Sequence, residues 1–104
     1  RATENGAYFL ERMQRLRELP IVGDVRGLGM WTCVDFAADK KTKEPFKDNT
    51  VRDVAERMAE LGVLGCEEGT AIEFAPAYTA TRDQIDHCVD ITEQAILEIA
   101  KGIT

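Results

Sequence analysis

The sequence is poor in the residues that metal sites and disulfide frameworks require. It has one histidine, His87, and three cysteines, Cys33, Cys66 and Cys88, none of them in a Cys-x-x-Cys pair. An odd number of widely spaced cysteines does not describe a disulfide framework. A zinc site needs about four ligands, which this set does not readily supply. We therefore expect free thiols, no metal ion and a reducing compartment, which indicates the cytoplasm.

Basic charge and long apolar runs are also scarce. Thirteen Lys and Arg stand against 19 Asp and Glu, for a formal net charge of −6. That balance argues against a nucleic-acid partner. The cluster Lys40, Lys41 and Lys43 lies between Asp39 and Glu44, and we interpret it as a solvated loop. No segment has the length of a membrane span, and none resembles a targeting peptide. We expect no membrane partner.

What the sequence does have is the composition of one small globular domain. Apolar residues make up 44% and charged residues 31% of 104 residues, which is enough for one modest core. The chain starts at Arg1 instead of Met, as expected for a fragment, an edited chain or a processed protein.

Periodicity predicts the secondary structure. A helix over residues 3–19 has the apolar stripe Ala7, Leu10, Met13 and Leu16, and Pro20 ends it. The segment 21–36 is read as a strand whose side chains alternate from residue 30 onward, with a bulge or bend at the glycine-rich residues 26–29. A polar loop follows over residues 37–49.

The second half of the sequence predicts two helices and a hairpin. One helix starts near Thr50, with a cap from residues 48–50, and ends at Gly62. Strands at 63–66 and 71–75 form a hairpin. The last helix begins at Thr81, where Gln84 completes a capping box, and ends at residues 101–102. The fold class is α+β, with a mostly antiparallel sheet of three to four strands and helices on one face.

Few residues suggest chemistry by themselves. Gly27-Leu28-Gly29 is no dinucleotide motif, and Glu67 and Glu68 disfavour a thiolate at Cys66. His87 is expected at the edge of its helix or exposed, and Trp31 in the core or an interface. Asp24 and Arg26 are read as an ion pair, with a ligand site as the alternative. These residues alone describe a small cytoplasmic domain of unknown function.

Three blocks of sequence add a resemblance. Residues 19–30 read LPIVGDVRGLGM, residues 43–46 read KEPF, and residues 74–76 and 81–86 read FAP and TRDQID. In this order and spacing they resemble the small C-terminal domain of class-III aminotransferases, most of all the ω-amino-acid–pyruvate subgroup. The resemblance runs from about residue 2 to the end, so residues 1–104 are expected to be this domain, without the large domain.

The resemblance implies a fold-type-I enzyme that uses pyridoxal 5′-phosphate (PLP) to move an amino group from an amine or ω-amino acid to a keto acid such as pyruvate. The cofactor lysine belongs to the large domain of that family. The resemblance therefore implies no catalytic and no cofactor-binding residue in this chain, which is expected to be inactive alone. The implied partners are the large domain, a second copy in a homodimer, and small amine and keto-acid substrates.

One departure from the family concerns the substrate. Many members place an arginine before the block at residue 76 to clamp a substrate carboxylate. That position is Cys66 here, followed by Glu67, and Ala77 replaces a family proline. Cys66 and Glu67 are the candidate substrate-binding residues. We expect the parent enzyme either to prefer a cationic amine donor or to take an arginine from elsewhere.

An alternative reading is a free-standing α+β module that kept the fold and acquired a binding or regulatory role. The missing arginine favours this alternative slightly. As a fragment, the domain is expected to expose apolar patches that the large domain would cover, and to self-associate.

Overall fold

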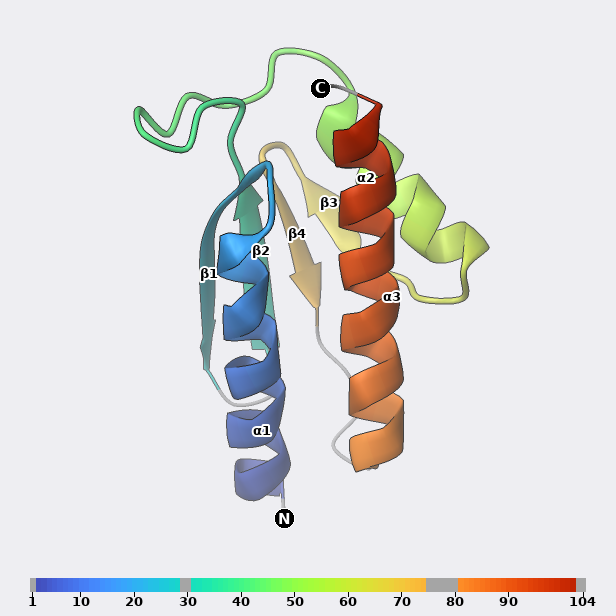
Figure 1. The fold of residues 1–104 in the computed structure, drawn as a ribbon. Coiled ribbons are helices and arrows are strands. Elements are labelled where there is room, and N and C mark those ends of the chain that lie inside the picture. Colours follow the sequence, from blue (N-terminus) through green and yellow to red (C-terminus); the bar gives the residue numbers. More distant parts are fainter. Residues whose placement is uncertain (1, 29–30, 75–80, 103–104) are drawn as a thin grey trace.

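The computed structural model describes residues 2–28, 31–74 and 81–102, without the side chains of residues 2, 3 and 28. Its strands form one sheet in the order β1-β2-β4-β3, and every neighbouring pair is antiparallel. The predicted α+β class is confirmed (Figure 1). The elements are α1 (Ala2–Gln14), the 3-10 helix η1 (Arg15–Glu18), β1 (Val22–Leu28), β2 (Trp31–Phe36), α2 (Thr50–Glu60), β3 (Cys66–Glu68), β4 (Ala71–Phe74) and α3 (Arg82–Lys101).

The helices pack on one face of the sheet, where α1 and α3 lie side by side (Figure 1). On that face β2 buries Thr32, Val34 and Phe36, and β4 buries Ile72 and Phe74. Side chains of a strand alternate between faces, so the intervening residues face away from the helices. We call that second surface the open face, and it consists of Asp24, Arg26, Trp31, Cys33, Asp35, Cys66, Glu68, Ala71 and Glu73.

The core joins one side of every helix to the sheet. In the first helix the expected stripe is partly wrong, because Ala7 is exposed and Leu10 only half-buried. The buried side chains are Phe9, Met13 and Leu16. A helix has 3.6 residues per turn, and the set at 9, 13 and 16 also fits that spacing. The remaining helices bury Val51, Val54, Met58, Ile85, Val89, Thr92, Ala95, Ile96 and Ala100.

The segment 21–36 contains two strands instead of one, so β1 is an addition to the predicted order. The glycines of β1 interrupt the alternation that would have revealed it. The irregular register lies between Val22 and Asp24, and not at residues 26–28, which pair regularly. Gly27 serves close packing, because a Cβ there would lie 2.7 Å from the carbonyl oxygen of Trp31. Gly29 and Met30 lie outside the described residues.

The predicted ends of the last helix are confirmed, whereas the first helix is an α-helix only to Gln14 and continues as η1. Asn49, the N-cap residue of α2, makes no side-chain cap hydrogen bond. Thr81 and Gln84 form both hydrogen bonds of the capping box, at 2.9 and 3.1 Å. Asp48 Oδ1 accepts from the backbone N–H of Thr50 at 3.0 Å, and Gly62 has a φ of +102° after α2.

The second hairpin is shifted relative to the prediction. β3 covers residues 66–68 instead of 63–66, and its turn contains Gly69 with a φ of +64°.

Candidate functional site: the open face of the sheet

A row of four side chains crosses the open face, one from each strand. The registers pair Arg26 with Cys33, Cys33 with Glu73, and Glu73 with Cys66. Directly paired residues of antiparallel strands lie on the same face, with Cβ atoms about 5 Å apart. The sheet thus brings together residues that are up to 47 positions apart, from 26 to 73 in the sequence.

A hollow of about 340 Å³ lies at the Cys66 end of this row. The indole Nε1–H of Trp31 donates to Glu73 Oε1 at 3.1 Å, which holds the ring beside the carboxylate. Trp31 is 41% and Leu64 85% exposed, so the hollow presents apolar surface to solvent. The hollow is lined by Trp31, Leu64, Gly65, Cys66, Glu73 and Phe74.

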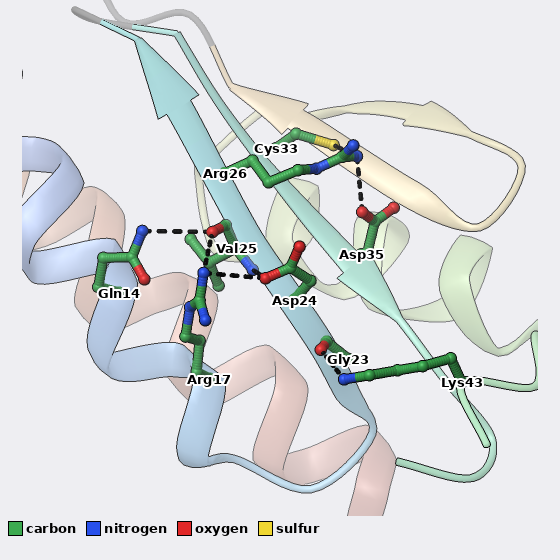
Figure 2. Close-up of polar contacts among 9 residues, drawn as sticks. All are labelled: Gln14, Arg17, Gly23, Asp24, Val25, Arg26, Cys33, Asp35 and Lys43. Carbon is green, nitrogen blue, oxygen red and sulfur yellow. Dashed lines mark hydrogen bonds and ion pairs between the residues drawn. The ribbon is translucent and has the colours of Figure 1, made fainter. Parts of the chain in front are cut away.

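The opposite end of the open face is made of ion pairs (Figure 2). Arg26 Nη2 lies 2.6 Å from Asp35 Oδ2 and 3.5 Å from Cys33 Sγ, and Arg17 Nη2 lies 2.9 Å from Asp24 Oδ1. The predicted pair between Asp24 and Arg26 is therefore wrong as a pair. Both residues still have structural ion pairs, each with another partner.

Side chains also cover the outer edge of β1 (Figure 2). Gln14 Nε2 and Arg17 Nη2 both donate to the carbonyl oxygen of Val25, and Lys43 Nζ donates to that of Gly23 at 2.6 Å. Exposed strand edges otherwise pair with other chains. The lysine loop is thus exposed, as predicted, and it also anchors the edge, because Lys40 Nζ donates to two further carbonyl groups, those of Arg17 and Leu19.

A second hollow, of about 620 Å³, lies beside this edge. Its charged lining consists of Asp24, Asp35 and Lys43. Each of these three groups already has a partner, since the carboxylates pair with arginines and the ammonium with a carbonyl group. The larger hollow therefore offers no unpaired charge for a ligand.

Cys33 and Cys88 are not placed as nucleophiles. Burial raises the pKa of the Cys33 thiol, although the Arg26 guanidinium opposes the shift, and burial in α3 likewise raises the pKa of Cys88. A raised pKa keeps a thiol protonated and unreactive. His87 is exposed. Within residues 2–28, 31–74 and 81–102, no group of three or more His, Cys, Asp or Glu side chains is placed to hold a metal ion.

One polar cluster was not predicted from the sequence. Arg12 of α1 donates to Asp86 at 2.7 Å and to Asp90 at 2.8 Å, both on α3, and the Tyr8 hydroxyl also donates to Asp86. The Arg82 guanidinium lies 4.2 Å from the centre of the Tyr8 ring. The i, i+4 spacing of the two acids is visible in the sequence, but their partner 74 residues earlier is not. The cluster joins two helices and lies away from the open face.

Residues 1–96 match the sequence model of the family described as aminotransferase class-III. The chain belongs to this family. The described part of this class-III aminotransferase chain has no helix that is long and apolar enough to cross a membrane.

Relatives and solved structures agree with this assignment. The chain is 34% identical to the diaminobutyrate–2-oxoglutarate transaminase of Halomonas elongata over 99% of its own length, and 32% identical to the leucine/methionine racemase of Thermococcus litoralis over 98%. It covers 23% of each relative. Among solved structures, a transaminase from an ancestral-reconstruction study is 32% identical, with a TM-score of 0.92 over 99% of this chain and 24% of that one. The chain thus spans about a quarter of the length of the proteins it matches.

The two candidate substrate-binding residues, Cys66 and Glu67, lie on opposite faces of β3. Cys66 pairs with Glu73 and faces the hollow, whereas Glu67 pairs with the buried Ile72 and so faces the helices. Arg52 of α2 approaches the Glu67 carboxylate at 3.7 Å. A substrate contact at either residue stays a prediction, and only Cys66 is placed on the open face.

Membership of the class-III aminotransferases implies PLP in the full-length enzymes. PLP needs donors for its phosphate and a lysine for its imine. The two hollows of the open face present carboxylates, and Lys43, which lines one of them, donates to a backbone carbonyl. These residues do not fit the cofactor.

Proposed function

We propose that residues 1–104 are the small C-terminal domain of a PLP-dependent aminotransferase, which moves an amino group from an amine or ω-amino acid to a keto acid such as pyruvate. The observation that carries this proposal is the family match over residues 1–96, in a chain that spans about a quarter of its relatives. In this proposal the cofactor and its lysine belong to the remaining three quarters of the parent, and the 104 residues are inactive alone.

The open face is the surface that the large domain would cover. The helices already pack on the other face, while Trp31 and Leu64 remain exposed near the open face. Exposed apolar side chains that gather into one patch mark a surface that a partner covers, and both of these line the same hollow. The proposal includes a homodimer, because enzymes of this family type assemble their active site between two copies. It also includes a cytoplasmic location, because the described thiols are free.

The reaction type needs its own test because the relatives differ in it. One relative is named a transaminase that uses 2-oxoglutarate, and another a leucine/methionine racemase. A transaminase transfers the amino group to a keto acid, whereas a racemase leaves the amino group on its carbon and inverts that carbon by removing and returning a proton. Consumption of a keto acid therefore separates the two reactions.

The rival proposal is a free-standing binding or regulatory module with the same fold. The cysteine at position 66 favours this rival proposal, because the resemblance implies a carboxylate-binding arginine at that position. The two proposals differ in the size of the natural protein and in its cofactor.

The experiment is to purify the product of the natural gene, measure its intact mass, and record its absorbance. The aminotransferase proposal predicts a mass about four times that of this chain, given its share of the relatives, and the visible absorbance band of an imine between PLP and lysine. A product of 11.6 kDa without that band would instead establish the module.

A further inference from the structure

We propose that Glu73, Trp31 and Cys66 form a subsite for the distal ammonium group of an α,ω-diamine donor. The subsite rests on the proposed function in one respect, because only an aminotransferase presents a reacting amine to this face. Its chemistry rests on the described residues alone.

The first argument is the geometry of the hollow. Trp31 donates to one oxygen of Glu73, so the exposed indole ring and the carboxylate stand next to each other. An ammonium group is attracted both by a carboxylate and by the face of an aromatic ring. The other oxygen of Glu73 has no hydrogen bond or ion pair within the described part of the chain.

The second argument is charge, which is negative at the hollow end of the open face. Of the four carboxylates on the described open face, Asp24 is paired with Arg17 and Asp35 with Arg26. Glu68 and Glu73, which lie toward the hollow, have no ion pair with a described residue. A surface with this excess of one sign attracts cations and repels anions.

The third argument is the distance from the hollow to the guanidinium. Arg26 lies on β1 and Cys66 on β3, at opposite edges of the sheet. Three strand spacings separate them, or about 14 Å. A substrate carboxylate beside Cys66 would thus meet Glu73 first, with no cation among the described residues that line the hollow.

The fourth argument concerns the spacer between the two amino groups of a diamine, which needs an apolar surface. Leu64, which is 85% exposed, lines the same hollow as Glu73 and supplies its apolar wall. A short chain of methylene groups can lie on such a wall while its ammonium group reaches the carboxylate. The hollow therefore suits a diamine better than a short, fully polar donor.

The binding experiment uses the whole natural protein and N,N,N′,N′-tetramethyl-1,4-diaminobutane, whose tertiary amines cannot form an imine. Calorimetry gives its Kd for the wild type, for Glu73→Gln and for the control Glu68→Gln. Both variants remove one negative charge from the open face, but Glu68 does not line the hollow. We expect Glu73→Gln to raise the Kd about tenfold, as the loss of a charge-assisted hydrogen bond would, and the control to change it less than about twofold. Equal effects of the two variants, or no binding by the wild type, would overturn the subsite.

The turnover experiment compares kcat/KM for 1,4-diaminobutane and n-butylamine, with pyruvate as acceptor. Glu73→Gln should reduce the ratio of the two values about tenfold, through KM for the diamine, whereas the control Glu68→Gln should leave the ratio unchanged. An unchanged ratio in an active enzyme would overturn the subsite while the proposed function stands. Absence of turnover with every donor would overturn the proposed function, and the calorimetric result would still decide the subsite.

Discussion

Cys66 and Glu73 are direct partners in the antiparallel ladder of β3 and β4, so their side chains stand together on the open face. The pairing brings Cys66, a candidate substrate-binding residue, next to a carboxylate seven residues later in the sequence. Any side chain placed at position 66 is therefore a neighbour of Glu73. A larger cation at that position would meet this carboxylate before it met a substrate.

The first prediction concerns substitution by arginine, the residue that the resemblance implies at this position. Cys66→Arg alone should form an ion pair with Glu73, and the preference for the diamine should be lost. The double variant Cys66→Arg with Glu73→Gln frees the guanidinium, so kcat/KM for 4-aminobutyrate should rise about tenfold. Donor kinetics of the two variants check this. If the single variant already uses 4-aminobutyrate as well as the double variant does, the two side chains do not interact.

The second prediction concerns the approach of Gly65 to β4. A Cβ at Gly65 would lie 2.5 Å from Cγ2 of Ile72, which is fully buried. Gly65→Ala should lower the free energy of unfolding by about 1–3 kcal/mol, as overpacking of a core does. Gly102→Ala is the matched control, because its added Cβ meets only ordinary contact at 3.5 Å. Urea denaturation measures both variants. Equal stability of the two would contradict the close contact.

The third prediction concerns a buried hydroxyl group. Thr32 is fully buried, and its Oγ1 has no hydrogen-bond partner among the described residues. Thr32→Val keeps the shape and removes the unsatisfied group, so the free energy of unfolding should stay equal or rise by up to about 1 kcal/mol. A loss of more than about 1 kcal/mol in urea denaturation would mean that the hydroxyl group has a partner.

The fourth prediction concerns the contact between α1 and α3. The Arg12 side chain is only 19% exposed and contacts both Asp86 and Asp90. Arg12→Ala should cost about 1–2 kcal/mol of unfolding free energy, because it breaks two charge-assisted hydrogen bonds and leaves the two acids close together. Arg15→Ala is the control, since Arg15 is exposed and belongs to no described ion pair. Equal midpoints in thermal unfolding would contradict a stabilising role for Arg12.

The fifth prediction concerns acid pH. Hydrogen bonds from Arg57, and then from Gln94, hold the pKa of the Glu98 carboxyl below its ordinary value of 4.5. A depressed pKa in the folded state adds stability that is present above the ordinary value and is lost as the pH falls through the folded value. Stability should therefore fall below pH 4.5, and Glu98→Gln should reduce that slope. An identical dependence of the unfolding free energy on pH in the variant would show that Glu98 does not contribute to the loss of stability in acid.

The local signals in the sequence identified most of the fold. The capping box of Thr81 and Gln84 and the glycine after α2 act over three or four residues, so spacing alone reveals them. The sequence did not predict β1, because its glycines interrupt the alternation of apolar and polar residues. Gly27 is needed because a Cβ there would collide with the carbonyl oxygen of Trp31, a contact that forms only in the folded hairpin. Phe9 was missed because two apolar stripes fit the same helix, and the contact with the sheet decides between them.

The candidate site could be predicted only in part. The departure at Cys66 is visible in the sequence through the resemblance, and the exposure of His87 follows from its helix face. The pairing of Cys66 with Glu73 and the hydrogen bond from Trp31 depend on the strand register and the order β1-β2-β4-β3, which periodicity does not give. The same limit explains the wrong pairing of Asp24 with Arg26, since their real partners lie on η1 and β2.

The central claim is that this domain serves amino-group transfer in a larger enzyme. The most direct measurement is the formation of alanine from pyruvate by the whole natural protein, with an isotopically labelled amino group on the donor. The account predicts labelled alanine in proportion to the donor consumed, with none from residues 1–104 alone. Donor consumption without labelled alanine from pyruvate, and without labelled glutamate when 2-oxoglutarate is the alternative acceptor, would contradict it.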